Sequence, residues 1–466
     1  MIVLKFIVFQ ILSVPAILLG VVAMVGLILL KKNPAKIITG TLKTIIGVLI
    51  ISGGAGILSS SLTPFGTIIN HGLNVQGIMP TNEAVLPYAL KNFGSMGAVI
   101  MVGGFVINIL LARFTKYKFI YLTGHIMLYV SLFVTAILES VAGLNGFALF
   151  IAGAVIMGLY FTFMPTLLYP YSKKITNGEK FTVGHTGDIG YWFSAWLGKY
   201  VGNPKKSAER FKLPKWLSFF SDSTTSMAIT MVPIYLIVVL IAGYGFVSKH
   251  VSGTTDPIMF AILQGLTFAA GVTVILSGVR MMLSEIIPAF SGISSKIVPG
   301  AVPALDCPVM FPYAPTALLL GFISMFIGMI IGMFFQMGFH SLYIILPGIV
   351  PAFFAGGTAG IFGNSTGGWK GAVIGPFIVG IVLAIGTGFL IPSTGALAKT
   401  GSTFGDPFYA TAGLAFAKWI KLVSGNVTVG ILVLAIIIAI IGLLLRRRNK
   451  KENELENSEI SSGVIK

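Results

Sequence analysis

The sequence predicts an all-α membrane protein that crosses the bilayer many times. Hydrophobic residues make up 55% of the 466 residues, and charged residues make up only 10%. A typical soluble domain carries about a quarter of its residues as Asp, Glu, Lys and Arg. The mean hydropathy is +0.94. Long apolar stretches recur along the chain, and about 20 apolar residues are what a helix needs to cross the hydrocarbon core.

By this measure we predict about eleven transmembrane helices, arranged as two sets of five followed by a last helix. The first set covers residues 6–30, 41–62, 93–112, 119–141 and 146–168. The second set covers residues 224–247, 258–287, 315–335, 342–361 and 371–391. The last helix covers residues 427–445.

Basic residues occur in blocks between the apolar stretches, so the formal charge of +17 does not indicate a nucleic-acid-binding face. The blocks follow the first, third, fifth and eleventh predicted helices, and the alternating loops are almost free of Lys and Arg. Basic residues concentrate on the cytoplasmic side of membrane proteins. We therefore expect the N-terminus outside and the C-terminus in the cytoplasm.

The two sets of five resemble each other weakly but in the same order. Gly56-Ile57 matches Gly292-Ile293, Leu122-Thr123-Gly124 matches Leu346-Pro347-Gly348, and the segment 184–188 is loosely matched by 402–406. An odd number of helices in each half forces the halves to insert with opposite orientation. We predict two inverted repeats, with the substrate of a carrier bound near the midplane between them.

The predicted domain organisation follows from this repeat. Residues 1–222 form the first inverted repeat, 223–425 the second, 426–446 a C-terminal transmembrane helix and 447–466 a polar cytoplasmic tail. Two segments, 181–200 and 393–417, are too polar and glycine-rich to span and too apolar to be free loops, which predicts re-entrant segments. Residues 214–221 are predicted to form an amphipathic interfacial piece.

The stretch from Gly278 to Asp306 carries the strongest functional signal. We expect its long helix to break ahead of the Asp306 carboxylate, over Pro288, Gly292, Pro299, Gly300 and Pro303. Interrupted helices next to a polar group are how membrane carriers form a substrate site. Asp306 therefore either accepts hydrogen bonds from a substrate or caps a helix start. We favour the first, because ionisable groups within a membrane are rare unless they are used.

Other polar residues in apolar surroundings are further candidates. His125 either binds substrate or satisfies a carbonyl of a neighbouring helix. His185, Thr186 and Asp188 form a polar cluster whose alternative is a solvated loop. Thr81, Asn82 and Glu83 follow Pro80, where they could also cap a helix.

The remaining reactive groups favour structural roles. Arg280 and Glu285 either pair with each other or with neighbours, and a structural ion pair is favoured over substrate contact. The single cysteine, Cys307, excludes a disulfide framework and is expected to be a small buried residue. The five histidines have no metal-ligand spacing and there is no Walker loop, so we expect no catalytic residues, metal or cofactor.

The sequence resembles the membrane subunit (enzyme IIC) of the ascorbate-type phosphoenolpyruvate-dependent phosphotransferase system (PTS). The resemblance runs from about Leu18 to the last predicted helix. Its most specific stretches are Lys43-Thr44-Ile45-Ile46-Gly47, Leu122-Thr123-Gly124-His125-Ile126-Met127, Lys212-Leu213-Pro214 with Trp216-Leu217, Gly278-Val279-Arg280-Met281, Ser291-Gly292-Ile293-Ser294, Ile297-Val298-Pro299-Gly300-Ala301-Val302, Asp306-Cys307 and Gly367-Gly368-Trp369.

The resemblance implies a homodimeric, multi-pass permease of the bacterial plasma membrane, surrounded by lipid. Its eleven helices would divide into a V-shaped domain that forms the dimer contact and a core domain that carries the sugar. A cytoplasmic IIB subunit, phosphorylated in turn through IIA, would phosphorylate the sugar-like substrate as it emerges. The IIC chain itself would not be phosphorylated, and no nucleic acid is implied.

The family's ascorbate contacts fall on ten positions of this chain, which are Thr81, Asn82, His125, Ile126, Met127, Leu128, Tyr129, His185, Thr186 and Asp306. Three of them depart from typical ascorbate carriers, which have a tyrosine in place of Asn82 and glutamines in place of Tyr129 and Thr186. L-ascorbate, a related sugar acid and a polyol all remain candidate substrates.

Two other functions are compatible with the same residues. The first is an ion-coupled secondary transporter of a small polar solute, with Asp306 as the proton or cation site. The second is a non-transporting receptor that has kept the permease fold. Retention of Thr81, His125, His185 and Asp306 together argues against the receptor, and a cytoplasmic surface that docks IIB would separate the permease from the ion-coupled transporter.

Overall fold

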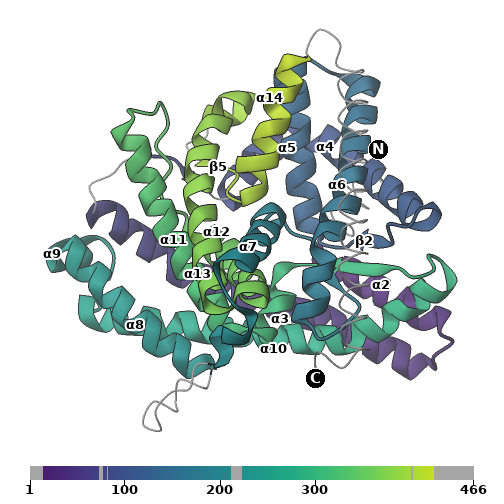
Figure 1. Ribbon diagram of the computed structural model, residues 1–466, viewed down its shortest axis with the longest axis horizontal. Helices are drawn as coiled ribbons and strands as arrows, with labels where there is room; N and C mark the ends of the chain where they lie inside the picture. Colours follow the sequence, from purple (N-terminus) through teal and green to yellow (C-terminus); the bar gives the residue numbers. More distant parts are fainter. Residues whose placement is uncertain (1–13, 73–76, 81, 211–222, 400–401, 424–466) are drawn as a thin grey trace.

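The computed structural model describes residues 14–72, 77–80, 82–210, 223–399 and 402–423, and these are mostly helical (Figure 1). Within them, seven helices are long and apolar enough to cross a membrane, or eight if one bent pair counts as a span. This is a multi-pass membrane protein. The predicted helix at 427–445, the piece at 214–221 and the start of the first helix lie outside the described residues.

One helical bundle is built from four helices. These are α2 (Pro15–Leu29), α3 (Pro34–Gly72), α8 (Ser223–Ala242) and α10 (Pro257–Lys296). The helices α3 and α10 pack closely through glycines, because a methyl group on Gly54 would lie 2.8 Å from the backbone nitrogen of Ile275. After α8 the chain bends by 99° into the short α9 (Tyr244–His250).

The predicted break of α10 at Pro288 and Gly292 is wrong, because the helix continues to Lys296. A proline inside a helix removes one backbone hydrogen bond, and packing outweighs that loss here. Gly292 lies against the backbone of α2, where a methyl group would meet the Gly26 carbonyl oxygen at 2.1 Å. After the helix ends at Lys296, the chain turns at Gly300, whose φ is +77°.

Glu285 of α10 is buried and pairs with α3. Its carboxylate oxygens lie 2.7 Å from Lys36 Nζ and 3.7 Å from Lys43 Nζ. Arg280 is exposed. The expected ion pair with neighbours is therefore found for Glu285, and it joins the two long helices of the bundle.

We expect Glu285→Ala to lower the free energy of unfolding by about 1–3 kcal/mol, because a buried charge-assisted hydrogen bond to Lys36 is lost. Thermal unfolding of the purified protein in detergent measures the change. Arg280→Ala, on the same helix but exposed, is the control and should stay within about 0.5 kcal/mol of the unsubstituted protein. Equal effects of the two substitutions would contradict a structural role for the ion pair.

The remaining long helices form a second bundle. They are α4 (Asn82–Phe114), α5 (Gly124–Ala142), α6 (Gly146–Ile175), α7 (Asp188–Val201), α11 (Pro315–Gly338) and α13 (Gly357–Leu390). The helices α7, α11 and α13 lie together (Figure 1). Short helical pieces connect them: η2 (Pro204–Lys206), η3 (Ala208–Arg210), η5 (Cys307–Tyr313), α12 (Ile349–Pro351) and η6 (Ala352–Gly356).

The helix α13 folds back on itself at Gly368, where φ is +61° and ψ is −154°. A methyl group on Gly363 would lie 2.2 Å from the carbonyl oxygen of Gly371. Residues eight apart in a straight helix are about 12 Å apart along the axis. The two arms of α13 therefore lie side by side as a helical hairpin. The predicted helix at 342–361 begins late, since helical structure starts at Ile349.

Two small parallel sheets were not predicted. In one, β4 (Val302–Leu305) lies between β2 (Phe119–Tyr121) and β3 (Thr182–Val183). In the other, β1 (Met79–Pro80) pairs with β5 (Ser402–Thr403), and Ile78 bridges to Ile345. The helix predicted at 119–141 therefore begins only at Gly124. Buried strands this short carry no periodicity that distinguishes them from helix.

Each of the two segments predicted to be re-entrant contains one of these strands, β3 in the first and β5 in the second. Residues 181–200 hold β3 and most of α7, which packs against α13. The described part of 393–417 continues from η7 (Ile391–Ser393) through η8 (Gly395–Lys399), β5 and η9 (Tyr409–Gly413) into α14 (Leu414–Leu422). Entry of the two segments from opposite sides of the membrane stays a prediction.

Candidate functional site

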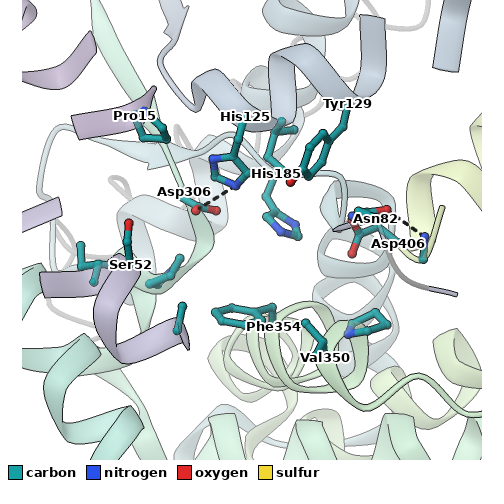
Figure 2. A pocket seen from close by; sticks show the side chains of 16 residues that line it. Pro15, Ser52, Asn82, His125, Tyr129, His185, Asp306, Val350, Phe354 and Asp406 are labelled. Carbon is teal, nitrogen blue, oxygen red and sulfur yellow. Dashed lines mark hydrogen bonds and ion pairs between the residues drawn. The ribbon is translucent and has the colours of Figure 1, made fainter. Parts of the chain in front are cut away.

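A cavity of about 320 Å³ lies where the strands of both small sheets end (Figure 2). The carboxyl ends of parallel strands lie on the same edge of a sheet, so the residues that follow them meet there. His125, His185 and Asp306 follow β2, β3 and β4, and Asn82 and Asp406 follow β1 and β5. The volume falls at the lower end of the range for small-molecule sites.

Both bundles contribute to the lining of the cavity. The first bundle supplies Pro15 of α2 and Ile51, Ser52 and Ala55 of α3. The remaining residues come from the strand ends, α5 and the segment before α13, and they are Asn82, His125, Ile126, Tyr129, His185, Asp306, Pro308, Val350, Pro351, Phe354, Gly405 and Asp406. The cavity thus combines apolar walls with a few convergent polar groups.

Asp306 caps a helix start, which is one of the two roles that the sequence left open, and it also lines the cavity. Its Oδ1 accepts a hydrogen bond from the Cys307 backbone N–H at 2.7 Å and caps η5. Its Oδ2 lies 3.5 Å from His125 Nε2 inside the cavity, and its side chain is 33% exposed. One oxygen is therefore structural, and the other faces the space that a ligand would occupy.

The orientation of the His185 ring is fixed by hydrogen bonds to its Nδ1. Its Nδ1 accepts a hydrogen bond from the Gly187 backbone N–H at 2.9 Å, and the Tyr191 hydroxyl lies 2.9 Å from the same nitrogen. Accepting a hydrogen bond needs a lone pair, so the proton of the neutral ring is on Nε2. The ring points into the cavity in Figure 2 and offers a donor there.

Asp406 is a site residue that the sequence analysis missed. Its Oδ2 accepts hydrogen bonds from Asn82 Nδ2 and Thr186 Oγ1, both at 2.6 Å. The Gly405 backbone N–H donates to Asn82 Oδ1 at 2.9 Å, which fixes the amide. Only the loose match between segments 184–188 and 402–406 pointed to this residue. Thr186 itself does not line the cavity, and it contacts the lining residue Asp406 from behind.

The cluster of His185, Thr186 and Asp188 is buried, so the solvated-loop interpretation is wrong. Asp188 is not among the residues that line the cavity. Its Oδ1 accepts a hydrogen bond from the Ile189 backbone N–H at 2.7 Å, at the start of α7.

Of the other residues predicted to contact the substrate, some line the cavity and some do not. Ile126 and Tyr129 line the cavity, whereas Met127 and Leu128 are buried in the packing of α5 and are not part of the lining. Thr81 lies outside the described residues.

Cys307 is buried, as predicted. Burial, followed by the nearby Asp306 carboxylate, raises the pKa of the Cys307 thiol well above its usual value. One ligand atom each of His185, Asp306 and Cys307 lies within 4.8 Å of the others. The thiolate is the form that binds metals, so this set is a poor metal site while the thiol stays protonated.

Comparison with known proteins gives two findings. The family described as "PTS system sugar-specific permease component" matches residues 10–407. The chain is also 29% identical, over 430 residues, to a Mycoplasma pneumoniae protein named ascorbate-specific PTS system EIIC component. That alignment covers 81% of this chain and 65% of the relative, so the chain matches just under two thirds of the relative's length.

Proposed function

We propose that this chain, which belongs to the family of PTS sugar-specific permease components, binds a small sugar-like substrate in the cavity at the strand ends and carries it across the membrane. The convergence of Asp306, His125, His185 and Asp406 on one cavity is the observation that carries the proposal. Ionisable groups are costly inside a membrane protein and are retained where they bind or move a solute.

The polar groups suit a polyhydroxyl compound. The Asp306 and Asp406 carboxylates accept hydrogen bonds, and the Nε2–H of His185 is able to donate one. Phe354, Val350 and the other apolar walls would cover the C–H faces of a small ring or chain. L-ascorbate, the substrate in the name of the Mycoplasma relative, a related sugar acid or a polyol would all fit this pattern.

The strand pairing supports the inverted-repeat organisation. Both sheets pair strands from the two halves of the chain. In the three-stranded sheet, β4 of the second half lies between β2 and β3 of the first half. In the two-stranded sheet, β1 of the first half pairs with β5 of the second half, and the preceding residue Ile78 bridges to Ile345. Such a reciprocal exchange is expected when two halves are related by a two-fold axis in the membrane plane.

The remaining parts of the proposal follow the family. The substrate would be phosphorylated by a cytoplasmic IIB subunit, charged through IIA, as it leaves the cavity. The permease would be a homodimer in the plasma membrane, with its C-terminus and basic loops in the cytoplasm and its eleven helices divided into core and V-shaped domains. The basic blocks between the apolar stretches support this orientation.

Uptake of labelled L-ascorbate, sugar acids and polyols tests the proposal, in cells that contain or lack the matching IIA and IIB subunits. We expect uptake of at least one compound, recovered as its phosphate ester, only when IIB is present. Uptake that proceeds equally without IIB would contradict group translocation and favour the ion-coupled transporter. Absence of uptake for every compound would contradict a sugar permease.

A further inference from the structure

A second cavity, of about 370 Å³, lies among the short pieces that follow α6 and α7. We infer that this cavity and the basic surface around it are the place where the phosphorylated IIB subunit docks on this chain. The inference rests on the proposed function, because it locates on the chain the partner that the proposed function requires.

The walls of the second cavity are joined by hydrogen bonds between elements that are far apart in the sequence. Asn364 Oδ1, on α13, accepts a hydrogen bond from the Ala208 backbone N–H of η3 at 2.8 Å. The Glu209 carboxylate, also of η3, accepts the backbone N–H groups of Thr316 and Ala317 at the start of α11, at 3.3 and 2.8 Å. The cavity is therefore a fixed part of the fold and not a space between loose loops.

The surface around this cavity is strongly basic. Lys174 of α6 and Arg210 of η3 line the cavity, and both are exposed. Neither forms an ion pair within the described residues, and the carboxylate of Glu209 is engaged by the start of α11. The two lining segments, extended to residues 173–180 and 199–210, hold seven exposed Lys and Arg residues and two exposed Glu residues, so their net charge is +5.

The lining suits a protein partner that carries a phosphoryl group. A phosphoryl group on a side chain has a charge of about −1.5 to −2 at neutral pH, and Lys and Arg are the side chains that bind phosphate most often. Lys174 and Arg210 supply two such cations, and Asn177 and Tyr313 add neutral hydrogen-bonding groups. Charge complementarity also guides two partners together and fixes their orientation.

Two segments connect the second cavity to the substrate cavity. In η5, Pro308 lines the substrate cavity and Tyr313 lines the second one. In the helical segment that leads into α13, Phe354 lines the substrate cavity and Ile361 lines the second one. Seven residues of helix span about 10 Å. A subunit docked at the second cavity is therefore about two helical turns from the sugar that it must phosphorylate. This proximity favours IIB over anionic lipid headgroups, which basic cytoplasmic surfaces also attract.

Binding of the matching IIB subunit to the purified full chain in phosphatidylcholine nanodiscs tests the inference. This lipid has no net negative charge, so it does not compete for the basic surface. A variant with Lys174→Gln and Arg210→Gln together should bind phosphorylated IIB about tenfold more weakly than the unsubstituted chain, because two charges that face the partner are lost. Raising the salt from about 0.05 to 0.5 M should weaken binding to the unsubstituted chain more than binding to the variant.

Two further variants separate this surface from basic charge in general. Lys32→Gln removes an exposed cation between α2 and α3, on the side of the membrane that the basic blocks place in the cytoplasm. Lys32 does not line the second cavity, so this variant should bind IIB as tightly as the unsubstituted chain. A variant with Lys174→Arg and Arg210→Lys keeps both charges and should retain most of the affinity.

Equal affinity of the glutamine variant and the unsubstituted chain for phosphorylated IIB would overturn the inference. An equal loss with Lys32→Gln, or failure of IIB to bind the unsubstituted chain, would overturn it too. If the glutamine variant keeps IIB but no longer retains phosphatidylglycerol in nanodiscs that contain it, the surface binds lipid instead. Each of these results leaves IIB-dependent uptake in cells to be observed, so the inference and the proposed function can fail separately.

Discussion

Asp306→Asn is expected to reduce IIB-dependent uptake by about one to two orders of magnitude. The reason is that a hydrogen bond to a charged group contributes about 1.5–3 kcal/mol. The asparagine oxygen can still accept from the Cys307 backbone N–H, so the cap of η5 is kept. What is lost is the negative oxygen that faces His125 and the cavity. Initial rates of labelled-substrate uptake, normalised to the amount of protein in the membrane, measure the effect.

The chain offers a closely matched control for this substitution. Asp256 also caps a helix, with its Oδ1 accepting from the backbone N–H groups of Ile258 and Met259 at the start of α10. It is exposed and is not part of the cavity lining. Asp256→Asn should therefore transport at close to the normal rate. If Asp306→Asn transports as well as Asp256→Asn, Asp306 does not bind the substrate.

Gly368→Ala is expected to lower the free energy of unfolding by about 3 kcal/mol or more. The φ and ψ of Gly368, +61° and −154°, are tolerated by glycine and strained for any residue with a side chain. The added methyl group would also lie 2.3 Å from the carbonyl oxygen of Lys206 and 2.4 Å from that of Asn203. The reversal of α13 could not form without a shift of this backbone, so thermal unfolding in detergent should begin at a much lower temperature.

Gly56→Ala is the control for the loss of a glycine. Gly56 lies within α3, and a methyl group added there would have no other atom within 4 Å, so alanine meets no neighbour. Alanine favours the helix by up to about 1 kcal/mol over glycine. The Gly56→Ala protein should therefore unfold at the normal temperature or slightly above it. A Gly368→Ala protein of equal stability would show that the hairpin does not depend on this backbone conformation.

The helices were predictable because each requires a long apolar stretch, and α6, α10 and α11 begin within three residues of the predicted positions. The strands were not, because two to four buried residues in a row fit helix and strand equally well. The path of α10 through Pro288 was set by packing against α2, which the local sequence does not contain.

The site was predictable where a polar group interrupts an apolar segment, as at His125 and Asp306. Asp406 sits instead in a glycine-rich segment in which polar residues are common. Its partners Asn82 and Thr186 lie 324 and 220 positions away in the sequence. No local pattern can indicate such distant contacts, and only the fold brings them together.

Substrate protection of a cysteine introduced at position 52 tests the central claim most directly. Ser52 lines the cavity from α3, and the native Cys307 is buried and should not react. A Ser52→Cys protein is treated with a small water-soluble thiol reagent, with and without a saturating transported sugar, and exposed Ser248 of α9 supplies the Ser248→Cys control. We predict that the sugar slows modification at position 52 and leaves position 248 unchanged. Equal rates at position 52 with and without the sugar would place the substrate elsewhere and contradict binding in this cavity.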